Sequence, residues 1–252
     1  MNSELFLPPK TLYRRTLNKL KRVPLIQVLY KNLNPLRKIE IASIQSYLTK
    51  NSDDYILDIG CGDGYWTNYF SKSAKKIIGI DPNKEDVEIA KKRAKQNVVI
   101  MTGQAEHLEF ADTTFDKVVS VCVFEHLLSD INSFKEIYRV LKKNGKLLAT
   151  VDSLNAPNIS NEHIKWHLKQ CYCNQLYDEK SISEKLASVG FTDIKIKYIS
   201  CSKLSIKWEI FNEQYGILSF CFVPVMYPLI RLVEMNISKN YGYKLFVKAE
   251  KI

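Results

Sequence analysis

The stretch YILDIGCGDGYW, residues 55–66, decides the fold of this chain. Its first five residues are strand-like, and Gly60, Gly62 and Gly64 follow before a helical pattern begins at Tyr65. Glycines between a strand and a helix N-terminus let a ligand approach the backbone, where free N–H groups attract polar or anionic groups. A tight turn alone can also require glycine, so the loop needs support from the rest of the sequence.

Outward from this loop, strand-like and helix-like segments alternate, which is typical of an α/β domain with a parallel sheet. We expect strands at 55–59, 76–80, 97–101, 117–123, 146–151, 193–200 and 241–248. Helices are expected between them at 65–73, 84–95, 130–141 and 178–189, with Gly190 as the left-handed cap of the last. The predicted fold class is therefore α/β, with a doubly wound sheet.

Two segments fall outside this alternation, 154–177 and 201–240, and we expect both to be cap insertions over a site. His163 and His167 share a helix face in the first insertion, and we expect them at the surface; the alternative is that they line the acceptor pocket. The predicted organisation is a basic N-terminal helical extension over 1–38 and a domain over 39–252 that carries both insertions.

Two carboxylates flank the glycine loop. Asp81 ends the second expected strand, where it can accept hydrogen bonds from both hydroxyls of a ribose; the alternative is that it caps the next helix. Asp58 precedes the first glycine by two residues, where it would repel a pyrophosphate and attract an ammonium or a sulfonium. The spacing is Gly-x-Gly-x-Gly rather than the Gly-x-Gly-x-x-Gly of nicotinamide dinucleotide loops.

From about residue 40 to 200, and in its last strand, the chain resembles the class I S-adenosylmethionine-dependent methyltransferases. The resemblance rests on five ordered motifs, at 57–64, 79–81, 103–110, 115–127 and 141–147. It implies a Rossmann-like, seven-stranded sheet with the last strand antiparallel. It also implies S-adenosylmethionine as cofactor and methyl transfer as the activity.

The same resemblance assigns cofactor-binding residues. Residues 60–62 would lie against the methionine part, with Asp58 near its ammonium, and Asp81 would hold the ribose. The full expected set is Asp58, Gly60, Cys61, Gly62, Gly64, Asp81, Pro82, Gln104, Ala105, Glu106 and Cys122.

The remaining roles concern the adenine ring and the acceptor. Ala105 would offer its amide to the adenine, and the backbone near Cys122 would hold the amino-acid end of the cofactor. Gln104 stands where the family often has aspartate, and its carbonyl oxygen can accept the same hydrogen bond. Methyl transfer needs a general base only if the acceptor loses a proton, and His126 is the candidate catalytic base; the alternative is that Glu125 and His126 pack the loop.

Cysteine usage predicts a reducing compartment and no metal. The start of the chain has no signal-peptide pattern, so we expect a cytoplasmic protein. Cys171 and Cys173 lack both a CxxC spacing and a second cluster at zinc spacing, so we expect them in a core rather than on a metal.

The net charge of +10 is concentrated at the N-terminus. Residues 1–38 hold nine Lys or Arg and one acid, a net +8, whereas the other 28 bases and 26 acids give +2. Residues 10–22 read as a basic amphipathic helix. Residues 214–230 carry no charge but are interrupted by glycine and proline, and they are shorter than the ~20 apolar residues of a spanning helix. They either roof an acceptor pocket or contact an anionic membrane surface beside the basic helix.

These observations predict an enzyme that transfers a methyl group from S-adenosylmethionine to a small, apolar or lipid-linked acceptor. Three alternatives stay open: a binding or regulatory protein of the same fold, a nicotinamide oxidoreductase, and a methyltransferase acting on nucleic acid. The last is disfavoured because residues 123–126 read Val-Phe-Glu-His instead of an Asn-Pro-Pro-Tyr-like sequence. The atom methylated and the oligomeric state do not follow from the sequence.

Overall fold

A computed structural model describes residues 34–50, 52–215, 219, 222–234, 237 and 239–252. The predicted basic helix at 10–22 lies outside these residues, and so does most of the predicted extension over 1–38. The predicted boundary between residues 38 and 39 falls inside the first described helix, α3, which spans Pro35–Gln45.

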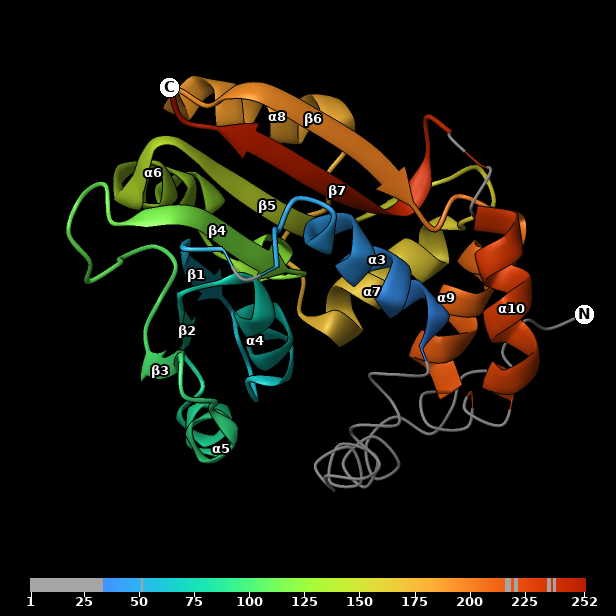
Figure 1. Ribbon diagram of the computed structural model, residues 1–252. Helices are drawn as coiled ribbons and strands as arrows, with labels where there is room; N and C mark the ends of the chain where they lie inside the picture. The colour runs from blue at the N-terminus through green and yellow to red at the C-terminus, as the bar shows by residue number, and fades with distance from the viewer. Residues whose placement is uncertain (1–33, 51, 216–218, 220–221, 235–236, 238) are drawn as a thin grey trace, which may run out of the picture. The chain divides into compact units, whose positions relative to one another are not determined.

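A seven-stranded sheet forms the framework, in the order β3-β2-β1-β4-β5-β7-β6 (Figure 1). Neighbouring strands from β3 to β5 pair in parallel, and β7 runs opposite to β6. The strands are β1 (Tyr55–Ile59), β2 (Lys76–Asp81), β3 (Val98–Thr102), β4 (Phe115–Val121), β5 (Leu141–Asn155), β6 (Thr192–Ile199) and β7 (Gly242–Glu250). The predicted Rossmann-like, doubly wound fold is confirmed.

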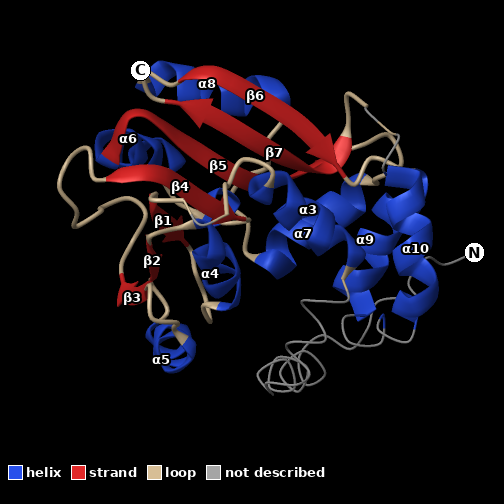
Figure 2. Ribbon diagram, in the orientation of Figure 1, coloured by secondary structure: helices blue, strands red, loops and turns tan. Residues whose placement is uncertain are grey.

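Helices connect the strands, and α6 and α8 lie side by side (Figure 2). The remaining helical segments are α4 (Tyr65–Phe70), η2 (Ser71–Ser73), α5 (Lys84–Arg93), η3 (Phe124–His126), α6 (Asp130–Val140), α7 (Asn161–Cys171), α8 (Glu179–Val189), α9 (Lys203–Tyr215) and α10 (Val223–Glu234). The first predicted insertion contains α7, and the second contains α9 and α10. Gly190 ends α8 in the left-handed conformation, as predicted.

The central strands are the most buried part of the sheet. Ile56, Leu57, Val118 and Val119 have no exposed surface, because β1 and β4 are covered on both faces and flanked by other strands. In parallel strands all carboxyl ends lie at one edge, so the loops that follow β1, β2 and β4 meet there. This edge carries the glycine loop and both carboxylates singled out above.

The predicted bounds of β4 and β5 are wrong. Phe115 pairs with Leu141 before a register shift, so β4 and β5 both begin earlier than their apolar runs. At its other end β5 continues to Asn155, which places Asp152 in a strand rather than in the loop after it.

The chain divides into two compact units. One comprises Ala42–Asn155, Ile159–Lys197 and Lys244–Ile252; we call it the sheet unit. The other, the helical unit, combines the described residues up to Ile41 with Ala156–Asn158 and Tyr198–Tyr243.

The helical unit has a core of its own, in which Val223 and Ile230 of α10 pack with Leu36 and Trp208. The opposite side of α10 exposes Val225, Leu229 and Leu232, and Phe222, just before the helix, is exposed as well. Among the described residues, no helix combines the length and apolarity needed to cross a bilayer.

Candidate functional site

The glycine loop runs from β1 to α4 with all three glycines at positive φ, 74° at Gly60, 51° at Gly62 and 75° at Gly64. The N–H groups of Gly60 and Cys61 donate to the Ile80 carbonyl at 2.9 and 3.0 Å, which fastens the loop to the end of β2. Left-handed backbone at three positions explains the need for glycine there.

Each glycine also meets different surroundings. A Cβ on Gly60 would lie 2.3 Å from a methyl of Val123, and one on Gly64 would lie 2.9 Å from the Cβ of Ala90. A Cβ on Gly62 would meet no atom within 4 Å. Two of the glycines therefore serve packing, and Gly62 marks where the loop borders open space.

Asp81 is held against this open part of the loop. One carboxylate oxygen accepts the N–H of Gly62 at 2.9 Å, and the other accepts the N–H of Asn83 at 2.9 Å. The side chain of Asn83, not that of Asp81, caps α5 by accepting from the N–H groups of Glu85 and Asp86. The alternative that Asp81 is the helix cap is therefore wrong.

Asp58 is buried near the loop and accepts the hydroxyl of Thr67 at 2.6 Å. Burial, reinforced by the charge of Asp81, raises the pKa of its carboxyl to about 7, although the hydrogen bond from Thr67 acts in the opposite direction. An ionised Asp58 is therefore costly in the ligand-free protein, and a cation bound beside it would relieve that cost.

The segment after β3 forms a small pocket of about 170 Å³. Gln104 and His107 form an isolated antiparallel bridge there, while Ala105 is buried. The lining residues are Ile80, Met101, Thr102, Gly103, Gln104, His107, Leu108, Glu109 and Phe110. Of the three cofactor-binding residues expected in this segment, the pocket includes Gln104 and leaves out Ala105 and Glu106.

A clamp that the sequence analysis missed holds this segment in place. Arg139 donates to the carbonyls of Leu108 at 2.8 Å and Phe110 at 2.7 Å, and Glu136 accepts the Leu108 N–H at 2.8 Å. Arg139 and Glu136 also pair with each other at 2.8 Å. Glu136 and Arg139 are three residues apart on α6, a spacing visible in the sequence. The same spacing is typical of ordinary ion pairs on a helix surface, so it does not indicate a clamp.

Three further expected residues lie at the same sheet edge or next to it. Pro82 is exposed between β2 and α5. Cys122 has a positive φ of 53°, and its N–H donates to the Thr150 carbonyl at 2.9 Å, so the chain turns sharply as it leaves β4. His126 is exposed, and its Nδ1 lies 3.3 Å from the Tyr172 carbonyl.

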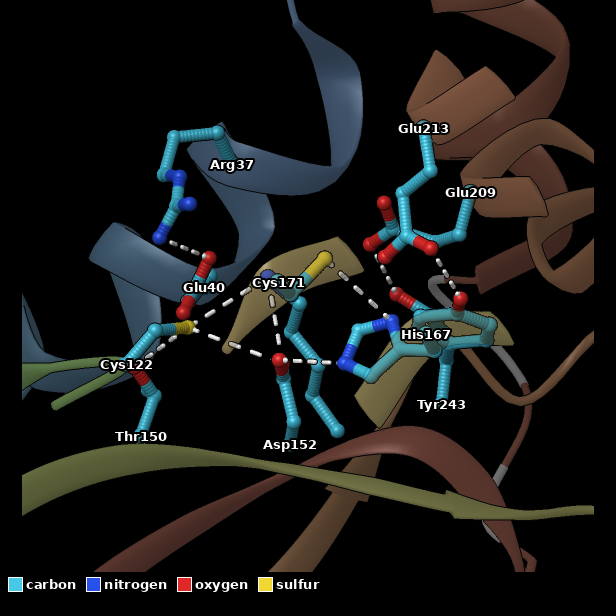
Figure 3. Close-up of polar contacts among 12 residues, drawn as sticks. Arg37, Glu40, Cys122, Thr150, Asp152, His167, Cys171, Glu209, Glu213 and Tyr243 are labelled. Atoms are coloured by element: carbon cyan, nitrogen blue, oxygen red, sulfur yellow. Dashed lines mark hydrogen bonds and ion pairs between the residues drawn. The ribbon is translucent and has the colours of Figure 1, made fainter. Parts of the chain in front are cut away.

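The predicted surface position of His163 and His167 is wrong. Both side chains are buried, and Nε2 of His167 lies 3.1 Å from a carboxylate oxygen of Asp152 (Figure 3). Asp152 was not a predicted site residue, because the strand predicted over 146–151 ends one residue before it. A partner fifteen positions away on another element leaves no local pattern.

Comparisons with known proteins agree with this fold. Residues 57–149 match a family model described as "Methyltransferase domain". The chain is 30% identical over 166 residues to the "Uncharacterized methyltransferase YcgJ" of Bacillus subtilis (strain 168), an alignment covering 64% of this chain and 65% of that protein. It is 32% identical over 124 residues to the "Ubiquinone biosynthesis O-methyltransferase" of Pelagibacter ubique (strain HTCC1062), covering 45% and 51%. The chain thus spans less than two thirds of either relative.

One solved structure resembles nearly the whole chain. It is an S-adenosylmethionine-dependent methyltransferase from Thermotoga maritima, with a TM-score of 0.65 and 19% identity, covering 95% of this chain and 98% of that one. At 19% identity this similarity shows the fold alone. Fold, family model and relatives agree: the chain carries a class I S-adenosylmethionine-dependent methyltransferase domain, matched over residues 57–149.

Proposed function

We propose that this protein transfers the methyl group of S-adenosylmethionine to a small, apolar acceptor. The observation that carries the proposal is the joint placement of Gly62 and Asp81, in which a carboxylate binds the N–H of the one loop glycine that borders open space. A buried Asp58 with a raised pKa adds a place for a cation.

These residues fit the cofactor. Asp81 has further lone pairs to accept hydrogen bonds from two ribose hydroxyls, and the open space at Gly62 leaves room for the methionine part against residues 60–62. Asp58 would pair with its ammonium. Gln104, Ala105 and Glu106 would hold the adenine ring, with Pro82 beside the ribose and the backbone of Cys122 at the amino-acid end.

The cofactor supplies an already activated methyl group, so the chain's own task is alignment and exclusion of water. The exposed imidazole of His126 follows β4 at the sheet edge that carries the proposed cofactor residues. For a hydroxyl acceptor, His126 would accept the proton that is lost. In that case His126→Ala lowers kcat and leaves the affinity for the cofactor unchanged.

The acceptor class is supported by one relative. The protein of Pelagibacter ubique is named for O-methylation in ubiquinone biosynthesis. We therefore expect S-adenosylhomocysteine to form when the protein is given the cofactor and a hydroquinone with an apolar chain. Turnover of tRNA with none of the hydroquinone would contradict the proposed acceptor and favour the nucleic-acid alternative.

Calorimetry tests the cofactor site directly. We expect the wild-type chain to bind S-adenosylhomocysteine and not NAD, and Asp81→Asn to weaken binding at least tenfold. Its amide can still accept the Gly62 N–H but cannot accept from two hydroxyls as a carboxylate does.

The matched control for Asp81 is Asn83→Ala on the same turn. It removes the cap of α5 and costs about 1 kcal/mol of unfolding free energy, but it should leave the affinity within twofold of wild type. Binding of neither S-adenosylmethionine nor its demethylated product, or an Asp81→Asn variant with wild-type affinity, would refute the cofactor assignment.

We further propose that α10 contacts an anionic membrane surface. Val225, Leu229 and Leu232 are exposed and fall within an arc of about 60° on a helix of 3.6 residues per turn, and the exposed Phe222 directly precedes the helix. An apolar stripe of this kind on a cationic protein is typical of interfacial helices. It lies apart from the buried side of the helix that carries Val223 and Ile230.

Co-sedimentation with anionic vesicles at low salt tests this contact. The wild-type chain should sediment with the vesicles, and the double variant Leu229→Ser, Leu232→Ser should stay in the supernatant. A control on the buried side, Ile230→Val, should sediment like the wild type. Equal recovery of all three proteins in the supernatant with and without lipid would refute the membrane contact.

A further inference from the structure

Three buried side chains with different donor atoms meet within the sheet unit. Asp152, His167 and Cys173 are each less than a tenth exposed, and their ligand atoms lie within 4.8 Å of one another. They come from β5, from α7 and from the turn after α7. None belongs to the cofactor site described above.

The local structure of α7 explains why Cys173 turns back onto His167. Ser160 caps the start of the helix by accepting the His163 N–H, and Tyr172 ends it in the left-handed conformation, with φ of 58°. The Cys173 N–H then donates to the Leu168 carbonyl at 3.0 Å. This ending satisfies a terminal carbonyl and reverses the chain, so the thiol points back along the helix.

The distances match a tetrahedral zinc ion. Sγ of Cys173 lies 3.6 Å and a carboxylate oxygen of Asp152 lies 3.1 Å from Nε2 of His167. Zinc bonds of about 2.3 Å to sulfur and about 2.0–2.1 Å to nitrogen and oxygen put tetrahedral S···N and O···N pairs roughly 3.6 and 3.3 Å apart. The two donor pairs that include His167 thus lie near the spacing that a shared zinc ion requires, and the third pair lies within 4.8 Å.

The imidazole presents a different nitrogen to each side. Nε2 faces Asp152, and Nδ1 lies 3.8 Å from Sγ of Cys171 (Figure 3). Nε2 also faces Sγ of Cys173. Histidine ligands bind a metal through one nitrogen and are oriented through the other. Cys171 therefore lies on the orienting side of the ring, outside the ligand set.

Charge also favours this group over its neighbour. A carboxylate and a thiolate balance the two charges of a zinc ion, and a mixed oxygen, nitrogen and sulfur set suits zinc rather than magnesium or calcium. Cys122, Glu125 and Asp152 form a second cluster, but Nζ of Lys244 lies 3.4 Å from its thiol and 3.8 Å from the other Asp152 oxygen. A lysine ammonium there opposes a second cation.

We propose that Asp152, His167 and Cys173 bind one zinc ion, which ties α7 to β5. Within the described residues this group supplies three donors, so the fourth tetrahedral position falls to water or to an oxygen of a bound molecule. The alternative is that the three side chains only hydrogen-bond to one another.

Cobalt substitution distinguishes the two, because a thiolate bound to Co²⁺ gives a charge-transfer absorption that a hydrogen-bonded thiol does not. The full chain is stripped with a chelator and titrated with Co²⁺, and Zn²⁺ is then added in competition. We expect one Co²⁺ per chain with the thiolate band, and loss of that band when Zn²⁺ displaces it. Absence of the band in the wild-type chain would overturn the proposal.

Matched variants assign the band. Cys173→Ser should lose it and bind Co²⁺ at least a hundredfold more weakly, whereas Cys171→Ser should keep the band with affinity within about threefold. A band that persists in Cys173→Ser, or disappears in Cys171→Ser, contradicts the assignment. Should Cys173→Ser fail to fold by circular dichroism, Asp152→Asn decides: it can still hydrogen-bond His167, so wild-type Co²⁺ affinity in this variant overturns the proposal.

Discussion

At the scale of single residues, Asp58 should make cofactor affinity depend on pH. Its carboxyl has a pKa of about 7 in the folded protein, well above the usual value for aspartate, because it is buried. If the ionised form pairs with the cofactor's ammonium, only the ionised fraction is competent to bind. Affinity for S-adenosylhomocysteine should then fall about tenfold from pH 8 to pH 6.

Calorimetry across this range, with Asp58→Asn as the comparison, checks the prediction. The variant should bind more weakly at pH 8 and show a flat profile. Stability gives a second readout: the folded state holds this proton more tightly than the unfolded chain, so the free energy of unfolding falls as pH rises from about 4 to about 7. A wild-type affinity that does not change with pH would show that Asp58 makes no ion pair with the ligand.

Two loop glycines should respond differently to the same substitution. Gly60→Ala places a methyl against the stiff side chain of Val123 in a left-handed backbone and should cost about 2–4 kcal/mol of unfolding free energy. Gly62→Ala adds a methyl where no protein atom is near, so it should cost only about 1–2 kcal/mol of backbone strain and weaken cofactor binding at least tenfold.

Urea denaturation and calorimetry on both variants separate the two effects. The informative comparison is the ratio of lost affinity to lost stability, which should be larger for Gly62→Ala. Wild-type affinity in Gly62→Ala would mean that the open space beside the loop is not where the cofactor lies.

At the scale of elements, α8 is anchored to the start of α6 by a buried carboxylate. Asp130 accepts from Lys185 at 2.5 Å and from the Tyr177 hydroxyl at 2.7 Å. Lys185→Met leaves this carboxylate with one donor fewer and should lower the free energy of unfolding by about 1–3 kcal/mol.

Lys180 is the matched control on the same helix, since its side chain is 82% exposed and its pair with Glu184 spans 3.9 Å. Lys180→Met should change stability by less than about 0.5 kcal/mol. Equal effects of the two substitutions in urea denaturation would show that Asp130 does not hold α8 in place.

Elements with a strong local pattern were predictable, and contacts between distant elements were not. Seven strands and four of the helices follow from periodicity and from breakers such as Gly190. The loop from Gly60 to Gly64 could be located because its three glycines lie within five residues of the chain. In contrast, the clamp of Arg139 and the approach of His167 to Asp152 depend on how separate elements pack, which no local pattern encodes.

At the scale of the whole molecule, the charge distribution predicts what residues 1–33 contribute. They hold seven bases and one acid, so their removal lowers the net charge from +10 to +4. A chain of residues 34–252 should bind anionic vesicles more weakly and with less dependence on salt, because fewer counterions are displaced. Its affinity for S-adenosylhomocysteine should match that of the full chain, since every proposed cofactor residue is retained.

Vesicle sedimentation at several salt concentrations, with calorimetry on the same samples, makes this comparison. Unchanged vesicle binding by the shortened chain would place the whole membrane contact on the apolar stripe of α10. Loss of cofactor affinity in the shortened chain would contradict the prediction that residues 1–33 take no part in cofactor binding.

The glycine loop contains a cysteine, Cys61, that a bound methyl donor could alkylate. Cys61 sits between the glycines, and burial together with the charges of Asp58 and Asp81 raises the pKa of its thiol, so it stays protonated at neutral pH. A sulfonium methyl donor is an alkylating agent. It reacts with thiolates rather than thiols, because only the deprotonated sulfur is a good nucleophile. The carboxylates proposed to bind the cofactor would thereby also protect the enzyme from methylating itself.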